Sequence, residues 1–261
     1  MRGWAGILRR ELTVSFRSPL AGALGGAFVL LAGAVAWLDL QEYMRASVQL
    51  AARLRMMGLP PQFLDLNDTL LAQNLGGLAF LCLIFLPLLG MGLLADERRG
   101  GTLELLMTSP LGEWPLVLGK WCGALLLYAF LLALTLPAQL LLAPHGDLAL
   151  PVVATAYLGL LLMGAAFLAL TLALGAFTRS PVIAAAGGFA LMFLLWALDG
   201  FARPGATGFP HGLLTSLSAL GHLAPFLRGL VDTADLIYFA VLSVLGLDLA
   251  RRGLASLRAG G

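Results

Sequence analysis

The chain has 261 residues, of which 60% are hydrophobic and only 11% are charged, and its formal net charge is +2 at pH 7. Its mean hydropathy is +0.92. A soluble domain carries roughly 25% charged residues and cannot cover its surface with so few. The composition therefore predicts an all-α polytopic membrane protein. No dense basic patch lies outside the membrane flanks, which excludes a nucleic-acid partner.

The first 17 residues carry an amphipathic pattern, with apolar residues on one side and arginines on the other. The apolar residues are Trp4, Ile7, Leu8, Leu12 and Phe16, and the arginines are Arg2, Arg9, Arg10 and Arg17. The pattern predicts a helix over 1–17 that lies on the inner leaflet, with Trp4 at headgroup level and the arginines near anionic lipid. The alternative is a basic flank without fixed structure.

Apolar stretches recur at the length that a membrane crossing needs, which is about 20 residues. The expected spans are 20–38, 74–95, 121–142, 150–177, 181–198 and 236–250. The last is short and contains Asp248. A local pair with Arg251 or Arg252, three or four residues along the helix, explains that carboxylate better than transport does.

The distribution of Lys and Arg predicts the orientation, because cytoplasmic loops carry the excess. With the N-terminus inside, eleven of the 16 basic residues lie in inner segments. Five lie in outer segments: Arg45, Arg53, Arg55, Arg203 and Arg228. We therefore expect a multi-pass protein of the bacterial inner membrane with both termini in the cytoplasm.

Two outer segments have distinct patterns. Residues 41–57 lack Gly and Pro, so they are able to extend the first span outward until Pro60 and Pro61 end the helix. The segment 204–227 contains three prolines, which exclude a straight helix. We expect short re-entrant helices there that dip into the outer leaflet, where they would be buried in protein or line a wet cavity.

The sequence offers no catalytic site, metal site or cofactor site. His145, His211 and His222 lie far apart on expected outer loops, without metal-ligand spacing. Cys82 and Cys122 lie inside apolar runs, which is typical of packing residues.

Few polar residues lie inside the expected spans. Gln73, Asn74 and Gln139 either line a pathway or bond to a neighbouring helix, and the second interpretation is favoured. The expected spans contain no series of ionisable residues, which disfavours a proton-coupled carrier. None of them has a polar face, which disfavours a water-filled channel. An apolar interior suits a lipid-like cargo or a machine that passes force across the membrane, and both remain open.

The second inner loop, 96–110, is the most informative segment. Gly100 and Gly101 permit a sharp turn, after which Thr102 can cap a short helix that Pro110 ends. Leu103, Leu105, Leu106 and Met107 make this helix more apolar than a solvated loop requires. Such a face is buried against another protein or, alternatively, against the membrane surface.

Two stretches resemble a known family. Glu97–Leu106, Ser109-Pro110 and Leu118-Gly119-Lys120 resemble the ERxxGTLELL…P…GK pattern of ABC-2-type permeases. The tail is similar to the gliding-motility permease subgroup and to the permeases of nitrous-oxide reductase copper maturation. It comprises Gly221-His222, Phe226, Arg228-Gly229, Asp232, Asp235–Tyr238 and Arg251-Arg252.

The resemblance implies a single type V exporter-like transmembrane domain over 1–261 with six spans, an N-terminal interfacial elbow helix and outer re-entrant helices. Two permeases would pair above two ATPase subunits, with a possible periplasmic accessory protein. The segment 96–110 would be the coupling helix, whose residues at the ATPase are Glu97, Arg98, Gly101, Thr102, Leu103 and Glu104. Arg99 departs from the family pattern, in which an acidic residue is common.

The resulting expectation is a permease subunit that couples ATP hydrolysis, carried out by a separate ATPase, to export or to mechanical work across the membrane. The chain itself would not be an enzyme. One alternative is a structural or assembly subunit without transport activity. An intramembrane enzyme acting on lipid is disfavoured, since no cluster of buried acidic, His or Ser residues is present.

Overall fold

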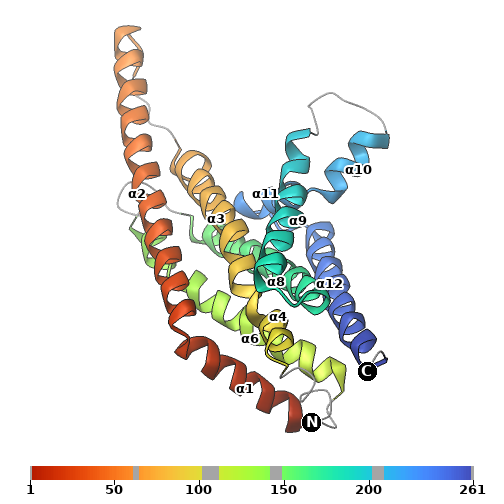
Figure 1. The fold of residues 1–261 in the computed structure, drawn as a ribbon. Helices are drawn as coiled ribbons and strands as arrows, with labels where there is room; N and C mark the ends of the chain where they lie inside the picture. Colours follow the sequence, from red (N-terminus) through yellow and green to blue (C-terminus); the bar gives the residue numbers. More distant parts are fainter. Residues whose placement is uncertain (1, 61–64, 102–111, 142–148, 202–208, 260–261) are drawn as a thin grey trace.

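A computed structural model describes residues 2–60, 65–101, 112–141, 149–201 and 209–259 (Figure 1). This part of the chain is helical and contains no strand. The longer helices are α1 (Arg2–Arg17), α2 (Pro19–Met56), α3 (Ala72–Gly90), α6 (Glu113–Ala133), α8 (Leu150–Phe177), α9 (Pro181–Phe201) and α12 (Thr233–Ala259). The shorter ones are the π-helical turn η1 (Leu66–Leu71), α4 (Gly92–Arg99), α7 (Leu136–Leu140), α10 (Phe209–Leu217) and α11 (Ala219–Leu227).

Within the described residues, six helical stretches are long and apolar enough to cross a membrane, which agrees with the expected number. They are Pro19–Met56, Thr69–Arg99, Glu113–Leu140, Leu150–Phe177, Pro181–Gly200 and Thr233–Leu257. The third begins at Glu113 rather than at 121, because Lys120 lies buried within the helix instead of ending it. In the sixth, Asp248 pairs with Arg251 at 3.1 Å and with Arg252 at 2.6 Å, as the local explanation required.

Helix α8 forms the centre of the bundle. Of its most apolar 18-residue stretch, 78% is buried, against 22% for the corresponding stretches of α2 and α9. A helix that is apolar all round must be enclosed by others, and α3, α6, α9, α11 and α12 surround this one. Glycines allow the closest approaches: a Cβ on Gly246 of α12 would lie 2.6 Å from the carbonyl carbon of Ala169. The core therefore depends on backbone contact between α8 and α12.

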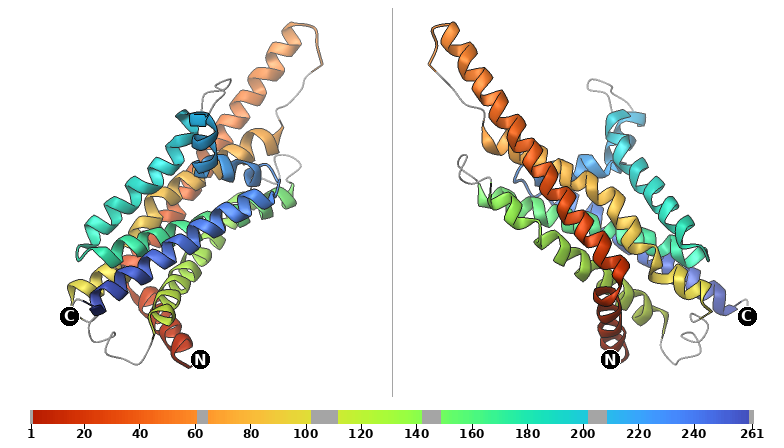
Figure 2. Two further views of the ribbon diagram at one scale, coloured as in Figure 1. Left: turned by 90° about the vertical axis from the view of Figure 1, so that its right-hand side faces the viewer. Right: turned by 60° about the vertical axis from the view of Figure 1, so that its left-hand side comes forward.

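Helix α2 is longer than a membrane crossing requires. Its 38 residues correspond to about 57 Å at the α-helical rise. The hydrocarbon core is only about 30 Å thick. The outer half of α2 extends beyond the rest of the bundle (Figures 1 and 2), and many of its side chains, such as Met44 and Val48, are exposed. The uninterrupted helix agrees with the absence of Gly and Pro from 41–57.

Different helices lie at the two ends of the bundle. Helix α1, α4 and the last turns of α12 lie at one end, whereas α10 and the outer half of α2 lie at the other (Figure 1). Between α9 and α12 the chain forms α10 and α11, and α11 packs against α8 and α9. His211 and His222 belong to these two helices and not to loops, which corrects the sequence-based placement. His145 lies outside the described residues.

Candidate functional site

The expected coupling segment begins where α4 ends. Gly100 caps α4, and Gly101 has φ = +70°, the left-handed conformation that commonly ends a helix and that glycine adopts without strain. Glu97 and Arg98 occupy the last turns of α4. Thr102, Leu103 and Glu104 lie outside the described residues. Helix α4 thus ends at the two glycines, where the sequence permits a turn.

Lys120 of α6 lies at the centre of a charged cluster that joins three helices. Its Nζ is 3.0 Å from Glu11 Oε1 on α1 and 2.9 Å from Glu97 Oε1 on α4. The Arg10 guanidinium lies 4.0 Å from the same Glu97 oxygen. Only 2% of Lys120 is exposed. Burying an isolated ammonium group costs a large free energy of desolvation. The two carboxylates offset that cost by pairing with Lys120.

Close packing of α1 on α6 places these charges in contact. A Cβ on Gly119 would lie 2.6 Å from Ile7 Cγ2, and one on Gly123 would lie 2.9 Å from Glu11 Cβ. The two glycines therefore let α1 approach the backbone of α6, with Lys120 between them. As a result, the elbow helix is fastened to the bundle by packing and by charge.

Arg98 binds within the permease as well. Its Nη1 donates a 2.6 Å hydrogen bond to the carbonyl oxygen of Ala176, in the last turn of α8. A guanidinium is favourable there, because the last carbonyl groups of a helix lack hydrogen-bond partners within the helix and form the negative end of its dipole. The end of α4 is thus held by α6 through Glu97 and by α8 through Arg98.

The residues expected on the elbow helix have different surroundings. Trp4 lies in α1, whose first side chains are outside the described part of the structure, and Arg9 is exposed. The Arg10 guanidinium lies 4.0 Å from Glu97 Oε1. The Phe16 ring meets the edge of Phe130 on α6, with centroids 5.4 Å apart. Helix α1 consequently packs along α6 in addition to presenting side chains to its surroundings.

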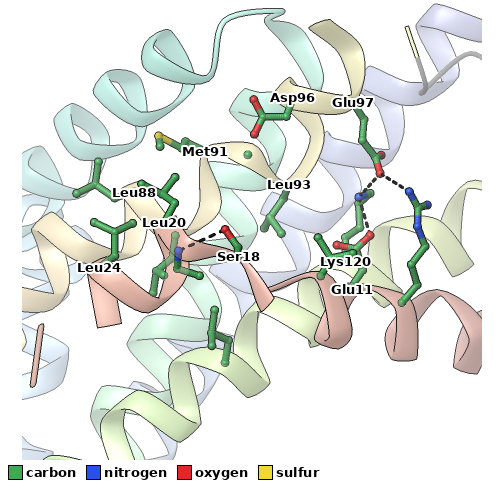
Figure 3. Close-up of a pocket in the computed structure, with 16 residues that line it drawn as sticks. Glu11, Ser18, Leu20, Leu24, Leu88, Met91, Leu93, Asp96, Glu97 and Lys120 are labelled. Atoms are coloured by element: carbon green, nitrogen blue, oxygen red, sulfur yellow. Dashed lines mark hydrogen bonds and ion pairs between the residues drawn. The ribbon is translucent and has the colours of Figure 1, made fainter. Parts of the chain in front are cut away.

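A hollow of about 320 Å³ opens beside the charged cluster (Figure 3). Its charged wall is formed by Glu11, Glu97 and Lys120, with Asp96 next to them on α4. Its apolar wall comes from the first turns of α2 and the end of α3: Leu20, Leu24, Leu88 and Met91. The bend at Ser18, whose side chain accepts from the Ala21 amide, separates α1 from α2 and leaves this space.

Sequence reasoning did not identify the partnership of Lys120 with Glu11. The available signals were a lone acidic residue on an otherwise basic amphipathic helix and a lysine beside the apolar run of the third span. Neither residue indicated the other, because they are far apart in the chain and meet only through tertiary packing.

The polar residues within the spans bond to one another. Gln139 Nε2 donates to Asn74 Oδ1 at 2.6 Å, and Asn74 Nδ2 donates to Asp39 Oδ2 at 3.0 Å. Gln73 Nε2 donates to the other oxygen of Asp39 at 3.3 Å. The network links α2, α3 and α7, which confirms the interpretation of helix-to-helix bonding. The buried ionisable residues Cys82 and Tyr128 likewise contact each other at 3.3 Å.

A second polar cluster lies around α10 and α11. His222 Nδ1 lies 2.7 Å from Asp235 Oδ1 on α12, and its Nε2 donates to the Ser216 carbonyl at 3.1 Å. The imidazole stacks on Tyr238 with centroids 4.1 Å apart, and the Tyr238 hydroxyl donates to the Leu217 carbonyl. These contacts join α10, α11 and α12.

Five apolar spans and α8 itself, with α1 packed along α6, define a polytopic α-helical membrane protein in the described part of the chain. The model of the ABC-2 family of transporter proteins matches residues 5–226. The chain therefore belongs to the ABC-2 family, and it is a membrane permease subunit of an ABC transporter.

Two curated relatives are named as ABC transporter permeases. The chain is 29% identical to the probable ABC transporter permease protein NosY of Pseudomonas aeruginosa, over 95% of this chain and 83% of that protein. It is 31% identical to the protein of the same name from Stutzerimonas stutzeri, over 45% of this chain and 37% of that protein. Both similarities agree with the expectation from the inner loop and the tail.

Proposed function

We propose that the chain is one half of a permease dimer that couples ATP hydrolysis, performed by a separate ATPase subunit, to export of an apolar cargo or to mechanical work across the membrane. The segment 96–110 would contact the ATPase, with Glu97, Arg98, Gly101, Thr102, Leu103 and Glu104 at or beside the contact. Because the ATPase is a separate subunit, no catalytic residue is assigned to this chain.

The observation that carries the proposal is the attachment of this segment at both ends. Glu97 lies at the start of the segment and Lys120 follows its end, and their side chains are 2.9 Å apart. Arg98 adds the bond to Ala176 of the central helix. A displacement imposed on the segment by an ATPase would therefore reach α4, α6 and α8 together, as a rigid-body movement requires.

The interior supports an apolar cargo or force transmission over ion transport. Among the described residues, the buried polar side chains within the spans are mostly uncharged: Ser47, Asn74, Thr135, Gln139 and Thr171. Asp235 is the buried carboxylate of the sixth span, and it pairs with His222. Lys120 is the buried cation, and two carboxylates neutralise it beside the inner segment. An ion pathway would instead present ionisable groups along its length.

A second permease copy fits the faces that the monomer leaves open. The spans in α2 and α9 are only 22% buried, whereas the central α8 is 78% buried. We propose that two copies pair and that two ATPase subunits dock at the end bearing α1 and α4. That end would face the cytoplasm of a bacterial inner membrane, because the excess of basic residues lies there. The outer half of α2 would then be available to a periplasmic accessory protein.

The proposed coupling contact is tested by co-purification of the ATPase with an affinity-tagged permease. Glu104→Arg reverses a charge in the segment and should reduce the amount of ATPase recovered. Glu42→Arg makes the same change on the exposed outer half of α2 and should leave recovery unchanged. Equal recovery of the ATPase with both variants, together with ATP-dependent activity, would contradict the assignment of this segment to the ATPase contact.

A further inference from the structure

A second hollow, of about 580 Å³, opens beside the one in Figure 3. It lies between α4, the start of α2 and the turn from α8 to α9. Leu20, Met91 and Asp96 line both hollows, so the two are neighbours. Arg99 and Arg179 supply two guanidinium groups to the second one.

The charges in the second hollow have no ion-pair partner among the residues that the structure describes. In the first hollow, Lys120 and Arg10 are matched by Glu11 and Glu97. By contrast, Asp96, Arg99 and Arg179 make no ion pair with any described residue, and all three are exposed. One anion and two cations therefore remain available to a ligand.

Hydroxyl groups from the α8–α9 turn complete the polar side. Thr178 Oγ1 accepts from the Ser180 amide, and Ser180 Oγ accepts from the Ile183 amide. Each bond fixes an oxygen and leaves its own O–H able to donate to an acceptor. The turn consequently presents two hydroxyl donors in the hollow that Arg179 lines.

The other side of the hollow is apolar and open. Leu20, Val182 and Ile183 have exposed fractions of 56%, 72% and 64%. They belong to the first turns of α2 and α9, where two spans begin. A hollow that is lined by charged groups, hydroxyl groups and exposed apolar side chains, where two spans begin, matches a molecule that has a charged head and hydrocarbon chains.

We propose that this hollow binds the headgroup of a zwitterionic aminophospholipid from the leaflet beside α1. The guanidinium groups of Arg99 and Arg179 would bind its phosphate, as planar donor forks do. The Asp96 carboxylate would accept hydrogen bonds from its ammonium group. The acyl chains would lie along Leu20, Val182 and Ile183. This site goes beyond the proposed function, since it requires no contact with the ATPase.

The three charged side chains of the hollow predict which phospholipid headgroup it prefers. An anionic headgroup would leave Asp96 opposed to it, whereas a choline headgroup offers no N–H donor to that carboxylate. Phosphatidylethanolamine supplies both a phosphate and an ammonium with three donors. It should therefore occupy the site in preference to phosphatidylglycerol and phosphatidylcholine.

A photoactivatable phosphatidylethanolamine, added to the purified permease–ATPase complex, tests the site. Labelling should map to the peptides that contain Met91–Arg99 and Phe177–Ile183, and unlabelled phosphatidylethanolamine should compete best. Asp96→Asn should lower that competitive advantage about twofold to fivefold, the range for an exposed ion pair. The double variant Arg99→Gln/Arg179→Gln should lower labelling with probes of all three phospholipids.

Matched controls are Arg17→Gln on α1 and Asp232→Asn before α12, because neither residue lines the hollow. Both should label as the wild type does, and the size-exclusion profile of every variant reports folding. Equal competition by phosphatidylglycerol, or an unchanged preference in Asp96→Asn, would overturn the proposal. A high-yield disulfide between two Val182→Cys copies without lipid labelling would also overturn it, since a second copy would then cover the hollow. Recovery of the ATPase in the wild-type complex tests the coupling contact separately.

Discussion

The Lys120 ammonium and the Glu97 carboxylate meet at 2.9 Å across the ends of the segment 102–111. Glu11 approaches the same ammonium from α1. One buried cation therefore fastens the elbow helix and both ends of the expected ATPase contact to each other. Movement of any one of these parts must carry the others or break an ion pair.

The first prediction concerns this cation. Lys120→Met should lower the stability of the permease by about 3 kcal/mol, because it leaves two largely buried carboxylates without their partner. Thermal unfolding in detergent measures the effect, and Arg17→Met is the control for loss of an exposed cation. Combining Lys120→Met with Glu11→Gln and Glu97→Gln should recover most of the loss. An unchanged melting temperature in Lys120→Met would show that the cluster contributes no stability.

The second prediction concerns the contact of α12 with α8. A Cβ on Gly246 would lie 2.6 Å from the carbonyl carbon of Ala169 and 2.8 Å from the Leu170 amide nitrogen. Backbone atoms cannot move aside as a side chain does, so Gly246→Ala should cost about 1–3 kcal/mol of stability. Gly33→Ala, where no atom lies within 4 Å of the added carbon, should cost little. Comparable melting temperatures for the two variants would contradict the close packing.

The third prediction concerns the polar network within the spans. Asn74→Leu removes the acceptor of Gln139 and one donor to Asp39, so it should destabilise the bundle by about 1–2 kcal/mol. Gln73→Leu, which removes a longer and exposed bond, should have a smaller effect. Unfolding of both variants under the same conditions provides the comparison. If Gln73→Leu proves the more harmful, the network does not join the helices in the way described.

The fourth prediction concerns the outer helices. His222→Phe retains a ring that can stack on Tyr238 but loses the bonds to Asp235 and Ser216. Amide hydrogen exchange in α10 and α11 should become faster, because these short helices lose their attachment to α12. Exchange in the buried α8 should remain slow and serves as the internal control. Unchanged exchange in α10 and α11 would indicate that the ring stacking and the Tyr238–Leu217 hydrogen bond hold them without His222.

The sequence predicts the spans well and the ion pairs poorly, for a physical reason. Apolar runs report burial in hydrocarbon directly, and the lack of Gly and Pro in 41–57 indicates that the first helix continues. A charged residue usually lies outside a span, however, and Lys120 is an exception because Glu11 and Glu97 neutralise it. The sequence also does not predict the pairing of His222 with Asp235, because this pair depends on how α11 packs against α12.

The length of α2 has a geometric consequence. A straight helix of 38 residues, about 57 Å long, amplifies a small tilt at its inner end into a large displacement at its outer tip. A pivot of about 10° would carry the tip through about 10 Å, as the arc of a rod of that length requires. The outermost turns, around Arg53 and Met56, are therefore the place where a distance probe would register motion of the inner end with the greatest sensitivity.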